Sequence, residues 1–321
     1  MKFTLRQLSY FVAAGETGSI TLASKRANIS QPAISTAISH IERELGVQLF
    51  LRHHAQGLSL TPAGRALVRE AKQLLKQAEN LYSAASETGH QVRGELSVGW
   101  FMTLAPVVMP ELVHSFMKAF PETRIRSTEA HQEHLIDNLR RAQIDVAITY
   151  DLQISEDITF VPLASLPPHA VFGATHPFAR ATSVTLSQLA SVPMVLLDLP
   201  MSRDYFLSLF IREQLEPTIS WSSPNQEVVR TMVANGYGFT LENVRPRASV
   251  ALDGRRLYRV PLTGDSPPVR IGIATLEQLK KTRLVETFER HCRELISGTY
   301  IPGMGAALVP QQRRKRRHRT S

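Results

Sequence analysis

The sequence predicts an α/β protein in three parts: a small helical head that ends in a hairpin, a long linker helix, and a larger body. Apolar residues at helical spacing predict the head, a leucine–alanine heptad predicts the linker, and alternating strands and helices predict the body. We expect the head at residues 1–61, the linker at 62–90, the body at 91–300 and a tail at 301–321.

The charge of the chain is concentrated at its two ends. The formal net charge is +9, of which residues 1–90 carry +4, residues 311–321 carry +6 and residues 91–310 carry −1. Basic ends on a near-neutral body indicate that a polyanion is contacted at the ends. We expect the tail after Pro310 to be disordered and to touch phosphates, with a targeting role as the alternative.

Composition argues against several classes of protein. Cys292 is the only cysteine, so neither a disulfide framework nor a cysteine metal cluster is predicted. No stretch approaches the ~20 apolar residues of a membrane span, and the N-terminus lacks the apolar core of a signal peptide. We therefore expect a cytoplasmic protein without membrane contact, and no cofactor is predicted.

The head is predicted to hold three helices, with Ser30 capping the third and Gly46 ending it. The third helix has an apolar stripe that consists of Ile34, Ala37, Ile38, Ile41 and Leu45. Its opposite face is small and polar as far as Arg43, and it carries Gln31, Pro32, Ser35, Thr36 and Ser39. Two helices joined by a tight turn, the second with such a face, are typical of a DNA-reading helix-turn-helix. An ordinary helical domain with a solvated polar face is the alternative.

A wing is predicted after the third helix. Leu49-Phe50 and then Leu58 and Leu60 alternate around Gly57, as the strands of a hairpin would. Several short motifs occur in order across the head: Ser30-Gln31-Pro32-Ala33-Ile34-Ser35, Ile41-Glu42, Glu44-Leu45-Gly46, Leu49-Phe50, Arg52 and Leu60-Thr61-Pro62-Ala63-Gly64. In these motifs the chain closely resembles the LysR-type transcriptional regulators, over roughly residues 3 to 90. The resemblance implies a winged helix-turn-helix that binds operator DNA.

The resemblance also assigns matching residues to DNA contact. Gln31, Pro32 and Ser35 fall where the family's recognition helix meets the major groove, and Arg52 falls where its wing meets the backbone. Chemically, glutamine can read adenine, and serine or threonine can bond to bases or phosphates. The expected DNA-contacting residues are Ser30, Gln31, Pro32, Ser35, Thr36, Ser39, Arg43 and Arg52. Thr36 departs from the family, because many members carry arginine there.

The tip of the wing departs from the family as well. It offers His53, His54 and Gln56 instead of the common arginines. Hydrogen bonding by an exposed wing is predicted. A histidine-pair metal site is the alternative, for which no third ligand is apparent.

The linker is predicted to be a dimerising helix, because it is rich in helix-forming residues and has a heptad repeat. Its narrow seam consists of Leu67, Ala71, Leu74, Ala78 and Leu81. A dimer would present two recognition helices to two half-sites of DNA. A long helix lying on its own domain is the alternative. The seam leaves parallel and antiparallel pairing open, and the resemblance implies antiparallel pairing.

The body is predicted to hold two series of alternating strands and helices, which argues for parallel sheets in two lobes. Segments 158–163 and 258–262 are the expected crossings between the lobes. Lobe I then spans about 91–161 and 267–300, and lobe II about 162–266. The pattern resembles the effector-binding domain of the same family, a Rossmann-like fold similar to the bilobed periplasmic binding proteins.

Ligands of such sheets bind at the carboxyl ends of strands, beside helix N-termini. The expected effector-binding residues are Trp100, Phe101, Met102, Thr103, His131, Asp198, Arg203, Phe239 and Thr240. Thr103 occupies the position of the hydroxyl residue that many relatives use to hold an effector. Donors beside an apolar wall suit a small organic acid, whereas Asp198 makes an amine or a zwitterion the alternative. Thr103 could instead be an N-cap, Trp100 a core residue, and His131 with His134 a solvated helix start or a metal pair.

We therefore predict a sequence-specific DNA-binding transcription regulator, not an enzyme, whose activity a small-molecule effector modulates. The expected partners are double-stranded DNA, the effector, further copies of the chain in a homodimer or homotetramer, and RNA polymerase. An α/β enzyme with an appended DNA-binding head is the alternative, although the sequence has no nucleophile elbow and no phosphate-binding glycine loop. An architectural DNA binder of little specificity is a third interpretation.

Overall fold

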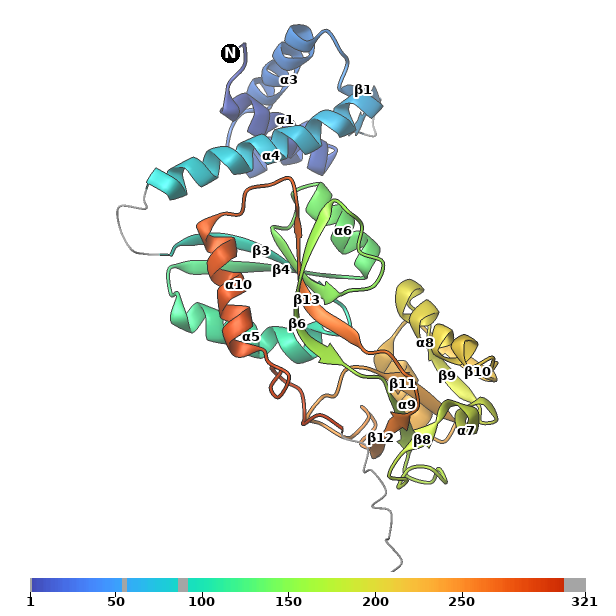
Figure 1. Ribbon diagram of the computed structural model, residues 1–321. Helices are drawn as coiled ribbons and strands as arrows, with labels where there is room; N and C mark the ends of the chain where they lie inside the picture. Colours follow the sequence, from blue (N-terminus) through green and yellow to red (C-terminus); the bar gives the residue numbers. More distant parts are fainter. Residues whose placement is uncertain (1, 54–56, 86–91, 309–321) are drawn as a thin grey trace, which may run out of the picture.

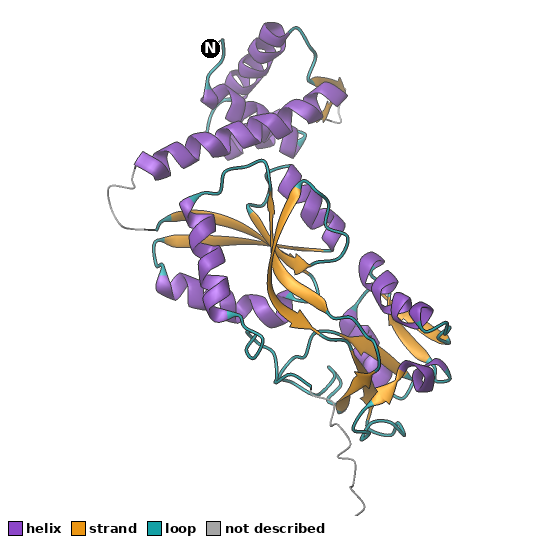
Figure 2. Ribbon diagram, viewed as in Figure 1, coloured by secondary structure: helices purple, strands orange, loops and turns teal. Residues whose placement is uncertain are grey.

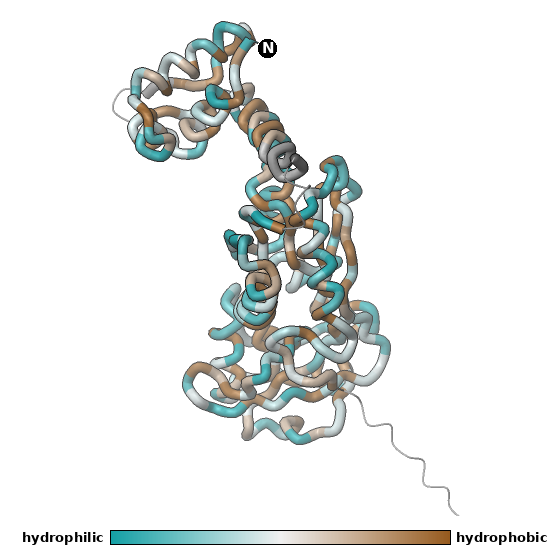
Figure 3. Tube along the Cα trace, turned by 90° about the vertical axis from the view of Figure 1, so that its left-hand side faces the viewer, coloured by the Kyte–Doolittle hydropathy of each residue, from teal (hydrophilic) through white to brown (hydrophobic). Residues whose placement is uncertain are grey.

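The computed structural model describes residues 2–53, 57–85 and 92–308 of the 321-residue chain. The molecule is elongated: the head lies at one end, the linker helix and lobe I follow, and lobe II lies at the other end (Figures 1 and 3).

The head is a three-helix domain with a two-stranded wing, as predicted. Its elements are α1 (Leu5–Thr17), α2 (Ile20–Ala27), α3 (Gln31–Leu45), β1 (Phe50–His53) and β2 (Gly57–Leu60), with β1 and β2 antiparallel. The apolar stripe of α3 packs into the core of the head around Phe11. Gly46 ends α3 with a positive φ of 67°, which glycine adopts without strain. Leu45 is 40% exposed, and its predicted burial is wrong because the last residue of α3 lies outside this core.

A carboxylate and a hydroxyl fasten the wing to the helices. Glu42 Oε1 accepts a hydrogen bond from the N–H of Leu49 at 2.8 Å. The Thr61 hydroxyl accepts one from the N–H of Gly64 at 2.9 Å and so caps α4 (Pro62–Ala85). A Cβ on Gly64 would lie 2.1 Å from the carbonyl oxygen of Leu49, so the wing and the linker helix approach closely only because this residue is glycine.

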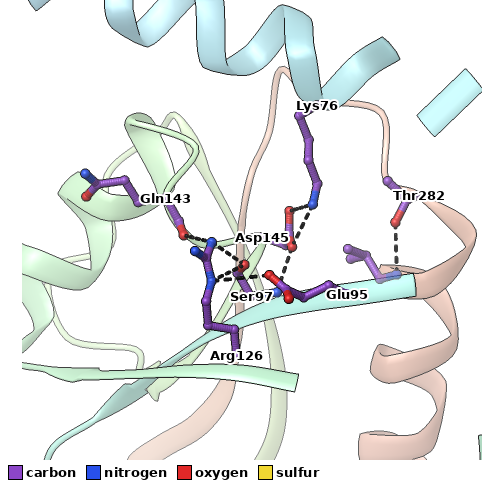
Figure 4. Close-up of polar contacts among 8 residues, drawn as sticks. Lys76, Glu95, Ser97, Arg126, Gln143, Asp145 and Thr282 are labelled. Atoms are coloured by element: carbon purple, nitrogen blue, oxygen red, sulfur yellow. Dashed lines mark hydrogen bonds and ion pairs between the residues drawn. The ribbon is translucent and has the colours of Figure 1, made fainter. Parts of the chain in front are cut away.

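The linker helix α4 forms ion pairs with both the head and the body. Lys72 and Arg26 each lie 2.5 Å from the carboxylate of Glu16 on α1. Burial opposes ionisation of Glu16, but the two cations outweigh it and hold the pKa of this carboxyl below its usual range. Further along α4, Lys76 lies 3.1 Å from Asp145 of the body (Figure 4). The linker is therefore tied to the domains on both sides of it.

Lobe I is built on a five-stranded mixed sheet with the strand order β4-β3-β5-β13-β6 (Figure 2). Its strands are β3 (Gly94–Phe101), β4 (Thr123–Ala130), β5 (Val146–Tyr150), β6 (Ile158–Leu166) and β13 (Val269–Leu276). Its helices are α5 (Ala105–Ala119), α6 (Gln132–Arg140) and α10 (Arg283–Leu295). Phe116 of α5 and Phe288 of α10 pack edge to face, with their ring centroids 5.1 Å apart.

Lobe II is built on a six-stranded mixed sheet with the order β10-β9-β11-β7-β12-β8. Its strands are β7 (His169–Gly173), β8 (Val184–Thr185), β9 (Met194–Leu197), β10 (Ile219–Ser223), β11 (Phe239–Glu242) and β12 (Leu257–Thr263). Its helices are α7 (Leu186–Ala190), α8 (Pro200–Arg212) and α9 (Gln226–Ala234). A second core of buried side chains fills this lobe.

The structure corrects two expectations about the lobes. Neither sheet is fully parallel, because β13 pairs antiparallel with β5 and β6, and β7 pairs antiparallel with β11 and β12. The segments expected to cross between the lobes are strands, and the crossings follow them at residues 167–168 and 264–268. Since β6 stays in the first sheet as far as Leu166, which pairs with Val269, the expected lobe boundary at residue 161 falls too early.

The chain after α10 folds back across the body instead of starting a disordered tail at residue 301. Met304 is buried and forms an antiparallel bridge with Pro246 of lobe II. The N–H of Gly303 donates to Glu111 of α5 in lobe I at 2.9 Å. We call residues 297–308 the C-terminal strap, because this segment contacts both lobes. The basic residues of the expected tail lie outside the described residues.

Gly64→Ala should destabilise the head, because the added methyl group would overlap the carbonyl oxygen of Leu49. We expect the free energy of unfolding to fall by about 1–3 kcal/mol, the usual cost of overpacking. Gly298→Ala is the control, since a Cβ at that position meets no atom within 4 Å. Chemical denaturation followed by circular dichroism measures both variants, and equal stabilities would contradict this close approach.

Candidate functional site

The polar face of α3 lies at the surface of the head. On the opposite face Ile34, Ala37, Ile38 and Ile41 are buried. The expected contact residues Gln31, Pro32, Thr36, Ser39 and Arg43 are exposed, and Ser35 is half-buried. Ser30 occupies the N-cap position of α3, but its side chain makes no capping hydrogen bond. The helix therefore offers a row of small hydrogen-bonding groups to a partner.

Arg43 is held by a contact that the sequence analysis did not anticipate. Its Nη2 lies 2.8 Å from Nδ1 of His40, and Nε2 of the same ring lies 2.8 Å from the carbonyl oxygen of Lys2. Since arginine can only donate, Nδ1 accepts and Nε2–H donates to the carbonyl. The i, i+3 spacing of His40 and Arg43 on one helix was the available signal.

The wing forms as expected, with Arg52 paired to Leu58 across the hairpin. His54 and Gln56, named in the sequence analysis, lie outside the described residues. The side chains of Arg52 and His53 also lie outside what the structure describes.

The expected seam of the linker divides between two environments. Ala71 is 3% exposed and belongs to the core of the head, with Leu67 packed against it. Leu74, by contrast, is 41% exposed within the single chain, and Ala78 is half-buried. The side chain of Leu81 lies outside the described residues. In one chain, therefore, part of this stripe packs against the head and part remains available.

The carboxyl end of β3 carries the expected aromatic residues into the core of lobe I. Trp100 and Phe101 are buried, as the core alternative for Trp100 predicted. Thr103 is 6% exposed, and its hydroxyl lies 3.3 Å from that of Tyr150. Thr103 does not cap α5, because Leu104 is the N-cap residue.

The first turns of α6 and α8 meet across a narrow cleft between the lobes. The lining residues are Phe101, His131, Gln132, Glu133, Leu199, Pro200 and Met201. The cavity between them measures about 10 Å³, which is no more than one water molecule requires. The lobes are therefore closed on each other, and an organic ligand enters only if side chains or lobes move.

His131 is, with Phe101, one of the two expected residues that line this cleft. It is the N-cap residue of α6, and its ring stacks on His134 with the centroids 4.3 Å apart. Its buried Nδ1 has no hydrogen-bond partner among the described residues. Two polar residues at this end of lobe I, Gln132 and Tyr150, were not among the predicted site residues. Gln132 lines the cleft, and its Oε1 accepts a hydrogen bond from the Thr149 hydroxyl at 2.9 Å. The Tyr150 hydroxyl lies beside that of Thr103.

Apart from Phe101 and His131, none of the expected effector residues is among the described residues that line this cavity. Phe239 is fully buried in the core of lobe II, because β11 is a central strand of the sheet. Thr240 is 1% exposed, and its hydroxyl has no partner among the described residues. Asp198 and Arg203 pair with each other at 3.2 Å and are partly exposed. Met102 is 39% exposed beside the cleft residues.

The described part of the chain holds neither a cluster of metal-ligating side chains nor a membrane-spanning helix. Within residues 2–53, 57–85 and 92–308, no three His, Cys, Asp or Glu side chains lie close enough to hold a metal ion. In the same ranges, every helix is too short or too polar to span a bilayer.

Two family models match the chain. Residues 5–65 match the bacterial regulatory helix-turn-helix protein of the lysR family, and residues 89–297 match the LysR substrate binding domain. The chain belongs to the LysR family. Both matches agree with the resemblance found in the head and with the two-lobed body.

Relatives of this LysR-family chain support the assignment. The hydrogen peroxide-inducible genes activator of Dickeya chrysanthemi is 30% identical over 238 residues, which cover 74% of this chain and 78% of the relative. The crystal structure of HinK from Pseudomonas aeruginosa is 36% identical, with a TM-score of 0.64, and covers 92% of this chain and 99% of HinK. Full-length OxyR from the same organism is 26% identical, with a TM-score of 0.74 and the same coverage.

The two LysR-family matches establish what the head and the body do. The chain is a DNA-binding transcription regulator with an effector-binding domain, as predicted, and its relatives are regulators rather than enzymes. The α/β enzyme considered as the alternative is therefore not supported.

Proposed function

We propose that this regulator reads its operator with the exposed face of α3, pairs through α4, and binds a small organic acid between its lobes. The observation that carries the proposal is the division of α3 into a buried apolar face and an exposed face of small polar side chains. Such a helix fits the major groove, where glutamine and hydroxyl side chains bond to base edges.

On the DNA side, Gln31 and Ser35 are the proposed base-reading residues, because they lie in the first turns of α3. Thr36, Ser39 and Arg43 lie further along the same face, where hydroxyl and guanidinium groups suit phosphate oxygens. Because the protein works on DNA, we expect it in the cytoplasm of the cell.

For assembly, we propose a homodimer through α4, which can further associate into a homotetramer. Support comes from Leu74, a large apolar side chain that is 41% exposed on a helix at the surface of the head. Burial of such side chains against a partner helix stabilises association. Contact with RNA polymerase is part of the same proposal for a regulator bound at a promoter.

On the effector side, a small organic acid is supported by the first turns of α6 and α8, which face one cleft. Free N–H groups at helix N-termini favour anions. His131 adds a ring nitrogen without a partner among the described residues, and Asp198 is already paired with Arg203. The acid must separate the closed lobes in order to enter, so its binding differs between lobe arrangements, as regulation requires.

Some relatives are named hydrogen peroxide-inducible genes activators. Sensing of peroxide by a cysteine thiol is not favoured for this chain. Cys292 is the only cysteine, and it is fully buried on α10. Burial raises the pKa of the Cys292 thiol, so the reactive thiolate is disfavoured.

Gln31→Ala tests the DNA-reading face. We expect specific operator binding to weaken by about 1–3 kcal/mol, the worth of a good base contact, with nonspecific affinity nearly unchanged. Fluorescence anisotropy at fixed salt, on operator DNA found by mapping bound sites and on scrambled DNA, measures both affinities. Gln278→Ala, at an exposed glutamine of the body, is the control. Unchanged operator affinity in Gln31→Ala would refute the placement of the recognition face.

Leu74→Glu tests the assembly. A carboxylate buried in a helix seam without a partner is costly, so we expect loss of the dimer and of tight operator binding. Light scattering on the full chain measures the mass. Arg69→Glu is the control, because Arg69 is exposed and faces away from Leu74 on α4. Its charge change is larger than that of Leu74→Glu, yet it should leave the mass unchanged. A dimer that survives Leu74→Glu would exclude this seam.

Thr103→Val tests whether the effector site extends from the cleft to the buried hydroxyl groups of Thr103 and Tyr150, which lie 3.3 Å apart. We expect loss of the effector response with operator binding in its absence intact, whereas Thr103→Ser keeps the hydroxyl and should retain the response. A thermal-shift screen of small carboxylic acids identifies the probe, and calorimetry compares its affinity for the variants. Wild-type affinity in Thr103→Val would place the pocket elsewhere.

A further inference from the structure

A second and larger cavity lies in lobe II, lined by the segment after β11, by the start of β12 and by the C-terminal strap. Figure 1 shows the strap running toward β12. The strap is hydrogen-bonded there: the N–H of Gly305 donates to the carbonyl of Arg245 at 2.7 Å, and that of Arg247 donates to the carbonyl of Gly303 at 3.3 Å. The cavity measures about 330 Å³, within the range of pockets that hold small molecules. It shares no lining residue with the cleft between α6 and α8.

The wall of this cavity is strongly basic. Arg245, Arg247, Arg256 and Arg259 all line it, whereas none of its lining residues is an aspartate or a glutamate. Arg247 is neutralised by Glu111 at 3.2 Å, and Arg256 is exposed to solvent. Arg245 and Arg259 are therefore the two arginines of this wall that are neither paired with a carboxylate among the described residues nor fully exposed to solvent.

Both side chains have buried N–H groups without a hydrogen-bond partner among the described residues. Arg245 is 5% exposed, and neither its Nε nor its Nη1 has a hydrogen-bond partner among the described residues. Nη2 of Arg259 donates to the carbonyl of Ala248 at 2.7 Å, but its buried Nε has no partner among those residues. Burial lowers the pKa of both arginines. Buried N–H groups and charges are normally paired, because leaving them unpaired is costly.

The buried carboxylate that interacts electrostatically with Arg259 is already committed to another arginine. Glu242 is buried and accepts two hydrogen bonds from Arg230, at 2.7 and 2.9 Å. His169, also buried beside Glu242, adds no counter-charge, and burial lowers its pKa to about 3. The positive charges of Arg245 and Arg259 thus have no ion-pair partner among the described residues.

We propose that this cavity binds the phosphate or carboxylate group of a small metabolite, with Arg245 and Arg259 as its ligands. The planar fork of arginine matches both anions in a bidentate geometry. The hydroxyl groups of Ser249 and Tyr258, which also line the cavity, can supply further hydrogen bonds.

Because of its position, an anion bound at this site can influence how the two lobes are arranged. Its wall is formed by lobe II and by the strap, and the strap is held to lobe I through Glu111. An anion that contacts both walls binds best when the strap is docked, so its affinity depends on the arrangement of the lobes.

The test is calorimetry on the full chain with inorganic phosphate and with succinate, each against chloride at matched ionic strength. We expect saturable binding of one anion per chain, and the two arms separate a phosphate from a carboxylate ligand. Arg245→Met should weaken this binding at least about tenfold, because it removes charge-assisted hydrogen bonds. Arg212→Met, which removes an exposed arginine of α8, should bind as the wild type does.

Stability without anion distinguishes a binding role from a structural one. Arg245→Met replaces an unpaired buried charge by an apolar side chain, so its melting temperature in anion-free buffer should equal or exceed that of the wild type. A lower melting temperature would indicate a structural role and overturn the proposal. So would the absence of saturable binding of both anions to the wild type, or equal binding by Arg245→Met. If that variant does not fold, Arg259→Gln gives the binding measurement but not the stability comparison, because Arg259 also donates to the carbonyl of Ala248.

Discussion

The strand β13 holds the body together. It follows lobe II in the sequence, and it lies between β5 and β6 in the sheet of lobe I. Its packing against β6 is tight, because a Cβ on Gly272 would lie 2.5 Å from the carbonyl oxygen of Val161. Since lobe II is inserted between β6 and β13, both ends of lobe II are fixed to one sheet edge. The cleft between the lobes and the path of the C-terminal strap depend on this insertion.

Buried charges show how the remaining parts are joined. Asp145 accepts hydrogen bonds from Lys76 of the linker and from the N–H of Ser97, so linker and body share one carboxylate (Figure 4). Arg230 and Glu242 satisfy each other inside lobe II. Where every charge has a partner, the contact is part of the scaffold. Incomplete pairing, as at Arg245, marks a place where the described part of the chain offers no partner and a ligand can supply one.

The cleft and the basic cavity differ in how much space they offer to a ligand. The cleft at His131 is closed to about 10 Å³, whereas the cavity at Arg245 has about 330 Å³. A ligand of the cleft therefore has to open the lobes, whereas a ligand of the cavity meets a site that is already formed. Ligands that prefer different arrangements of the same two lobes would influence each other's affinity.

The sequence by itself determined the features that depend on local periodicity. The stripe of α3, its polar face, the glycine at position 46 and the alternation of strands and helices follow from the spacing of residues, because that spacing fixes which side of an element is apolar. Only the tertiary structure decided what each apolar side meets. Ala71 packs into the head, Phe239 lies in the core of lobe II, and the strap is held between the lobes. These outcomes rest on contacts between segments far apart in the chain, which local spacing does not encode.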